Sequence, residues 1–237
     1  MTRISEDLKP PKYWKRFYGW LYGDKFWSAF FCQNWVQTVL TLGNNNRLIQ
    51  SVLEEVRRND KVLQIGATFG HQIDDTAEQI GLEGRYDLMD VSMTQLNLAR
   101  KKYQYVFPQM DFIHQNAIHK IKKPGHGYDV VICYMLLHEV PPQTKSKIIK
   151  NVLNAIRENG KVVFVDYHRP LFYHPLRYIV RMINRLWQPF AEKLWDLNIA
   201  DYCSDRLKYN WRKTLFFGKM YQKTVVTKRM PNIWEEF

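Results

Sequence analysis

The stretch Asp60 to Gly70 combines an apolar run with two glycines, a pattern that suggests ligand chemistry. Residues 62–65 are typical of a buried parallel strand, and Gly66 and Gly70 follow them. A strand that turns through glycine into a helix directs backbone N–H groups at a ligand beyond the strand's carboxyl end. The stretch therefore predicts a nucleotide or cofactor cradle, with an ordinary tight turn as the alternative. The expected contacts are Gly66, Ala67 and Thr68.

Polar residues at the ends of the next strands fit the same ligand. Asp90 closes the strand-like run 86–92, where a carboxylate could accept hydrogen bonds from both ribose hydroxyls. Asn116 follows a third run, residues 111–114, where an amide could contact an adenine edge. The further expected cofactor contacts are Asp90, Val91, Asn116, Ala117 and Cys133.

A second group of reactive side chains follows the fourth and fifth predicted strands, residues 128–133 and 160–166. An imidazole with carboxylates suits Mn²⁺ or Fe²⁺, and a metal there could polarise a carbonyl group. A direct acid–base role and simple hydrogen bonding are the alternatives. The predicted metal ligands are His138, Glu139 and Asp166, and the predicted catalytic residues are Gln64, Tyr134, His138, Asp166 and His168.

Strand and helix patterns alternate along the chain at a regular interval, which predicts an α/β protein with a doubly wound, mostly parallel sheet. With Asp90, Asn116 and the segment 129–140, the order of motifs over residues 45–230 resembles the class I S-adenosylmethionine-dependent methyltransferases. That resemblance implies a Rossmann-like sheet of seven strands. It also implies that residues 216–227 form the antiparallel hairpin at the end of the sheet.

A narrower resemblance concerns the motifs Val62–Ala67, Asp166–Pro170 and His174–Arg177. These look like the rhodoquinone-biosynthesis family RquA. That family is implied to transfer an amino group from S-adenosylmethionine to ubiquinone, replacing a methoxy group, with a divalent metal expected to be Mn²⁺. The alternative is a conventional methyltransferase acting on a quinone or another lipophilic small molecule.

Gln64 stands where such methyltransferases usually carry an acidic residue, and Thr68 where they carry a further glycine. A carboxylate would hold the cofactor's α-amine as an ammonium group, whereas a neutral amide leaves more of the amine deprotonated and nucleophilic. Gln64 could therefore favour amine chemistry. It could equally satisfy buried hydrogen-bonding groups.

The composition indicates one domain with an anionic partner. The chain has 237 residues, a formal charge of +12 and 15% aromatic residues, including eight Trp. A basic, aromatic-rich surface suits acidic lipid head groups or nucleic acid, and no nucleic-acid motif is recognised. We therefore expect an anionic membrane surface as partner, no nucleic acid, and a cytoplasmic protein peripheral to the inner face of the bacterial inner membrane. The cysteines Cys32, Cys133 and Cys203 show no paired spacing, which suits a reducing compartment.

The predicted organisation has three parts. Residues 1–42 form an aromatic and basic helical lid, or alternatively a helical face packed on the core. Residues 43–237 form the methyltransferase-like domain. Within it, residues 170–200 are an amphipathic helical insertion that could lie in a membrane interface or pack on its own sheet. No run of apolar residues is long enough to predict a membrane span.

Overall fold

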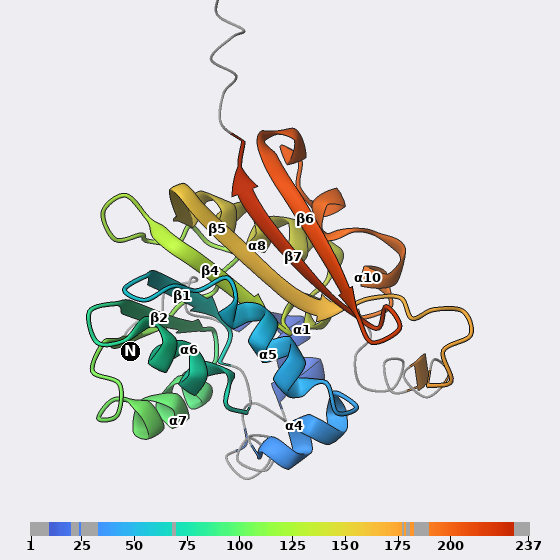
Figure 1. Ribbon diagram of the computed structural model, residues 1–237, viewed down its shortest axis with the longest axis horizontal. Helices are drawn as coiled ribbons and strands as arrows, with labels where there is room; N and C mark the ends of the chain where they lie inside the picture. Colours follow the sequence, from blue (N-terminus) through green and yellow to red (C-terminus); the bar gives the residue numbers. More distant parts are fainter. Residues whose placement is uncertain are drawn as a thin grey trace, which may run out of the picture.

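A computed structural model describes residues 10–19, 24, 33–67, 70–176, 178, 181–182 and 190–229. Its strands form one seven-stranded sheet in the order β3-β2-β1-β4-β5-β7-β6 (Figure 1). Strands β1 to β5 pair in parallel, and β7 is antiparallel to β5 and β6. This is the class I methyltransferase fold, so the predicted fold class is confirmed. The strands are β1 Lys61–Ile65, β2 Arg85–Asp90, β3 Met110–His114, β4 Tyr128–Tyr134, β5 Ile156–Tyr167, β6 Tyr209–Phe216 and β7 Tyr221–Lys228.

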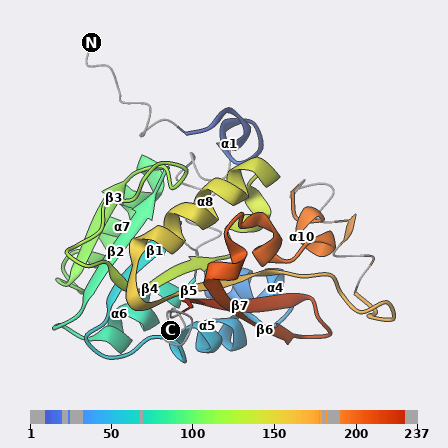
Figure 2. The same ribbon diagram turned by 90° about the horizontal axis from the view of Figure 1, so that it is seen from above.

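Helices cover both faces of the sheet (Figure 2). One face carries α5 Asn45–Leu53, α6 Gln72–Ile80 and α7 Met93–Tyr103. The other carries α8 Pro142–Ala155, α10 Lys193–Asp196 and the short turn η3 Ile199–Tyr202. The remaining elements are α1 Lys12–Phe17, which lies beyond α8, α4 Asn34–Leu40, η2 Leu137–Glu139 and η4 Arg206–Lys208. None of the helices in the described part of the chain is long and apolar enough to cross a membrane.

The central strands are apolar on both sides because helices cover both faces. In β4, Val130 and Ile132 face the core beneath α5 and α6, whereas Val131 and Cys133 face the core beneath α8. This alternation explains why the strands read as continuous apolar runs in the sequence. It also fixes which side chains at the strand ends point to which layer.

Several boundaries differ from those expected. The apolar spacing from Arg47 to Arg58 predicts one helix, but α5 ends at Leu53. The hairpin begins at Tyr209 rather than at Phe216. Residues 216–227 therefore hold only its turn and second strand. Ser92 caps α7 as predicted, because its hydroxyl accepts a hydrogen bond from the Gln95 N–H. Most of the predicted helix 176–195 lies outside the described residues; α10 is its described end.

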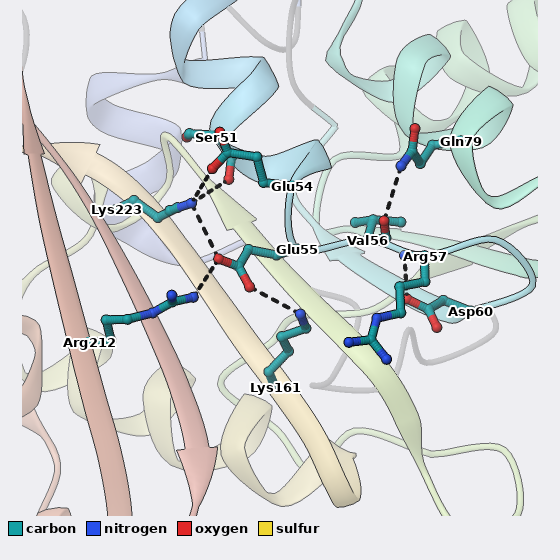
Figure 3. Close-up of polar contacts among 10 residues, drawn as sticks. All are labelled: Ser51, Glu54, Glu55, Val56, Arg57, Asp60, Gln79, Lys161, Arg212 and Lys223. Carbon is teal, nitrogen blue, oxygen red and sulfur yellow. Dashed lines mark hydrogen bonds and ion pairs between the residues drawn. The ribbon is translucent and has the colours of Figure 1, made fainter.

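An ion-pair network ties the residues that follow α5 to the sheet (Figure 3). The carboxylate of Glu55 is buried and contacts Lys161 of β5 at 3.0 Å, Arg212 of β6 at 2.7 Å and Lys223 of β7 at 3.3 Å. Lys223 also pairs with Glu54 and donates to the Ser51 carbonyl. Three strands and one helix end are thereby held in one arrangement, since a buried charge is costly without partners.

Candidate active site

The sheet order reverses between β1 and β4, so the segments that leave these strands diverge at their carboxyl ends. Such a switch point is where open α/β sheets bind ligands. The glycine loop after β1 and η2 after β4 meet there, since a Cβ on Gly66 would lie 3.6 Å from Leu136 Cδ1. Gly66 has φ +89° and Gly70 has φ +85°, conformations that disfavour other residues. The predicted cradle is therefore a strained glycine turn at the expected edge.

Asp90 links this loop to the end of β2. One carboxylate oxygen accepts the Ala67 N–H at 2.7 Å, and the other accepts the Ser92 N–H at 2.6 Å. The N–H groups of Gly66 and Ala67 were expected to face a ligand, but they bond Met89 O and Asp90 instead. The Val91 N–H is a third backbone partner of this carboxylate, so one lone-pair position is left for a ribose hydroxyl. Burial raises the pKa of Asp90 to about 6 despite the backbone hydrogen bonds.

Gln64 lies within a buried polar network under the glycine loop. Its Nε2 donates to Gln72 Oε1 at 2.7 Å, and its Oε1 accepts the Tyr86 hydroxyl at 2.6 Å. Gln72 in turn donates to Thr76 of α6. Both ends of the Gln64 amide are thus engaged inside the domain. Of its two predicted roles, the structure shows the second, satisfaction of buried polar groups.

His138 and Asp166 form a buried pair between the ends of β4 and β5. His138 Nδ1 lies 2.9 Å from Asp166 Oδ1, and both side chains are almost fully buried. A carboxylate can only accept, so Nδ1 carries the proton and Nε2 is left with a lone pair. Burial lowers the pKa of His138, but the charge and hydrogen bond of Asp166 and the charge of Glu139 outweigh it, and the pKa lies above its ordinary value.

The geometry does not fit the predicted metal site. Asp166 accepts four hydrogen bonds, from His138 Nδ1 and from the backbone N–H groups of Leu137, His138 and Tyr167. Its lone pairs are therefore taken, and Nδ1 of His138 is also occupied. Nowhere in the described ranges do three or more His, Cys, Asp or Glu side chains gather as a metal would need. His138 and Asp166 are a hydrogen-bonded pair rather than ligands.

Aromatic rings surround this pair. The Tyr167 ring meets the His138 ring edge-on at 4.8 Å and stacks on Tyr221 at 5.5 Å. Tyr134, at the end of β4, buries a hydroxyl that has no hydrogen-bond partner among the described residues. Burial, followed by the charge of Tyr167, raises the pKa of Tyr134, so its phenol stays protonated and can donate to a ligand.

The described part of the N-terminal segment packs close to the same place. Tyr13 and Phe17 of α1 meet the Phe190 ring at 6.0 Å and 5.7 Å. Tyr18 is buried; burial first, then the charges of Glu139, Tyr13 and Asp166, raises its pKa. Tyr18 therefore senses the charges around His138. Both interpretations of residues 1–42, a lid and a helical face packed on the core, stay predictions.

The remaining predicted residues divide into three groups. The Cys133 thiol is buried among apolar residues under α8, and burial raises its pKa, so it does not face the cradle. His168 lies apart from the His138 pair, because its Nδ1 contacts the Lys219 carbonyl at 2.9 Å. Val91 and Asn116 lie near the carboxyl ends of β2 and β3: the Val91 carbonyl contacts His114, and the Asn116 side chain accepts a hydrogen bond from the Ile118 N–H. Ala117 is buried next to Asn116, and Thr68 lies outside the described residues.

Sequence reasoning missed three residues that define this site. Tyr167 contacts His138, and Gln72 and Tyr86 hold Gln64. Gln72 is a fully buried amide on the apolar face of α6, and a polar residue on such a face is the signal that could have found it.

Comparison with known proteins agrees with this arrangement. The family model described as "Methyltransferase domain" matches residues 62–160. Among solved structures, the chain resembles human N-acetylserotonin methyltransferase in complex with S-adenosylmethionine (TM-score 0.63, 14% identity, covering 92% of this chain and 60% of that one). It also resembles an O-methyltransferase described as putative from Nostoc punctiforme (TM-score 0.62, 19% identity, covering 82% and 60%).

Two further similar proteins differ in how much of their own length this chain covers. A TehB-like S-adenosylmethionine-dependent methyltransferase from Corynebacterium glutamicum aligns over 87% of this chain and 100% of its own length, with TM-score 0.58 and 13% identity. A non-reducing polyketide synthase from Penicillium brasilianum is 27% identical over 138 residues, which are 54% of this chain but 5% of that protein. The family model covers less than half of this chain, so together these similarities show the class I methyltransferase fold.

Proposed function

We propose that the protein transfers a methyl group from S-adenosylmethionine to a hydroxyl of an apolar small molecule. The observation that carries the proposal is the buried His138–Asp166 pair beside the glycine loop at the switch point. The cofactor supplies an electrophilic methyl group, which leaves its sulfur for the acceptor oxygen. The chain's own residues have to bind both molecules and remove one proton.

The residues present fit the cofactor. Asp90 offers one remaining lone-pair position on its carboxylate, and Gly66 and Gly70 carry no side chain at two positions of the adjacent turn. Tyr134 brings an unpartnered buried donor to the same edge. These groups suit a ligand with sugar hydroxyls and a polar amino-acid end.

His138 suits the role of general base. Asp166 fixes the ring by holding Nδ1–H, so Nε2 can accept the proton of an acceptor hydroxyl. The surrounding rings of Tyr134 and Tyr167 favour an apolar, aromatic acceptor such as a phenol or hydroquinone. The small-molecule O-methyltransferases among the similar structures support the same choice of atom.

Amination of ubiquinone in the manner of the RquA family, with Mn²⁺, stays a prediction from resemblance. Gln64 was the residue that favoured this amine chemistry, and its amide is hydrogen-bonded to Gln72 and Tyr86. Location on the cytoplasmic face of the bacterial inner membrane stays a prediction as well.

The test is incubation with S-adenosylmethionine and a panel of phenols and hydroquinones, including ubiquinol, followed by mass spectrometry. We expect S-adenosylhomocysteine and a methyl ether in equal amounts, both lost in His138→Ala. A product in which an amino group has replaced methoxy would establish amination instead. Equal turnover in His138→Ala would refute the assigned base.

A further inference from the structure

The segment after β5 exposes large apolar side chains to solvent. Phe172 is 82% exposed, Tyr173 78%, Tyr178 75% and Met182 58%. Several large apolar side chains exposed along one segment indicate an interaction surface. With the exposed cations Arg169 and Lys219 beside them, we name these six residues the aromatic rim.

The rim is held by backbone contacts. His168 N–H donates to Met220 O at 2.7 Å, and Leu171 N–H donates to Gly218 O at 2.9 Å. The His174 ring meets the Phe217 ring edge-on at 5.1 Å. The loop that carries Phe172 and Tyr173 is therefore fastened to the β6–β7 turn. Its rings are presented by a fixed backbone, as a docking surface requires.

The charges of the rim favour an anionic partner. Arg169 and Lys219 lie at the two fastened segments, and neither forms an ion pair with another described residue. Nearby, Arg47 lies over the Phe216 ring at 5.5 Å. Arg181 is paired with Glu192 at 3.4 Å, so we leave it out of the rim. The whole chain carries +12, which adds a general attraction to negative surfaces.

We propose that the aromatic rim docks on the head-group region of an anionic lipid bilayer. Tyr and Phe side chains prefer the boundary between water and hydrocarbon, and cations beside them pair with acidic head groups. The combination matches a bilayer surface better than nucleic acid, because the cations stand among apolar rings. The apolar members of the rim belong to the insertion 170–200, for which the sequence predicted membrane contact, and residues 177, 179–180 and 183–189 of that insertion lie outside the described residues.

The position of the aromatic rim also indicates where the acceptor enters the site. This inference, unlike the docking itself, rests on the proposed methyl transfer. Tyr167, which contacts His138, is followed within a few residues by Arg169 and Phe172. An acceptor dissolved in the bilayer would then enter the site from the docked side. The rim narrows the acceptor class to lipid-soluble phenols and hydroquinones.

The test is sedimentation of the full chain with vesicles of phosphatidylcholine, alone or mixed with phosphatidylglycerol. We expect binding to the mixed vesicles only, weakened by salt. Phe172→Ser/Tyr173→Ser should weaken it at least about tenfold, and Arg169→Gln/Lys219→Gln about thirtyfold, from roughly 1 kcal/mol per cation. The matched controls are Tyr105→Ser/Val106→Ser, 89% and 62% exposed at the opposite edge of the sheet, and Lys122→Gln/Lys123→Gln. Both controls should bind normally.

Absence of binding by the unaltered chain would overturn the proposal, as would equal losses in rim and control variants. A change from dimer to monomer in Phe172→Ser/Tyr173→Ser, seen by light scattering without vesicles, would identify the rim as a contact between copies and also overturn it. S-adenosylmethionine binding by calorimetry should be unchanged in every rim variant. Loss of vesicle binding with cofactor binding intact separates this proposal from the proposed methyl transfer.

Discussion

Asp166 holds His138 twice: Oδ1 accepts the ring Nδ1–H at 2.9 Å, and Oδ2 accepts the backbone N–H of the same residue at 3.2 Å. Ring and backbone are thus oriented by one carboxylate. Such double anchorage fixes both the tautomer and the direction of Nε2.

The base assignment predicts a large loss of activity when the imidazole is removed. His138→Ala should lower kcat for methyl transfer about 10²- to 10⁴-fold, the usual contribution of a positioned base. The Kd of S-adenosylmethionine, measured by calorimetry, should stay within about threefold, since no cofactor contact is removed. Joint loss of cofactor binding and activity would point to a structural role instead.

The raised pKa of His138 predicts the shape of the pH profile. The base has to be neutral, so kcat/KM should rise with pH through a midpoint above the ordinary value of 6.5. Asp166→Asn removes the charge that raises this pKa, while burial continues to lower it. The midpoint should therefore move to lower pH in that variant, alongside a lower plateau. An unmoved midpoint would assign the titration to another group.

Asp90 predicts a pH dependence of cofactor binding. Its pKa of about 6 means that the carboxyl becomes protonated below that pH and loses acceptor capacity towards ribose. The affinity for S-adenosylmethionine should accordingly weaken as the pH falls from 7 towards 5. Asp90→Ala should weaken it about 10- to 100-fold at neutral pH, as expected for one hydrogen bond to a charged group. That variant should also lose the pH dependence.

The close packing of Gly218 against His174 in the loop after β5 can be tested by adding a side chain at position 218. A Cβ there would lie 2.2 Å from His174 Cδ2, and the residue has φ +55°. Gly218→Ala should lower the free energy of unfolding by about 2 kcal/mol from strain and collision together. Gly125→Ala is the matched control, because Gly125 has φ +49° and no heavy atom within 4 Å of an added Cβ. Denaturant unfolding should show a smaller loss there, and His174→Ala should partly rescue Gly218→Ala.

The network around Glu55 predicts unequal effects for two neighbouring residues. Glu55 is buried among three cations, so Glu55→Ala should lower the free energy of unfolding by about 3 kcal/mol. Glu54 pairs with Lys223 from an exposed position, so Glu54→Ala should cost less than about 1 kcal/mol. Urea unfolding of both variants makes the comparison. Equal losses would contradict the network's assigned role.

The same network has a pH dependence. Burial alone would raise the pKa of Glu55, but Lys161 and Lys223 outweigh it, and the net pKa is lowered. A lowered pKa stabilises the fold above the ordinary glutamate value, and this stability is lost as the pH falls through the folded value. Glu55→Gln should flatten the acid limb of the stability curve.

The sequence predicted the sheet and the place of Asp90 at the end of a strand, because apolar strands buried on both faces leave a clear pattern. It did not predict the start of β6, an edge strand whose exposed Arg212, Lys213 and Thr214 give no core-facing signal. The predicted metal ligands are a different case. Residue types show that Asp166 could bind a cation, but the backbone N–H groups that occupy it appear only in the fold. The hydrogen bonds of Gln64 could not be predicted from sequence either, since its partner Tyr86 lies on another strand.

The place of β7 in the sheet affects how the protein is made. Although β7 follows every other strand in sequence, it lies between β5 and β6 (Figure 1). While the ribosome is still short of Tyr221, the long β5 edge stays bare and can pair with another nascent chain. Synthesis of this protein therefore carries an aggregation hazard until residue 228 has emerged, and chaperones should raise its soluble yield.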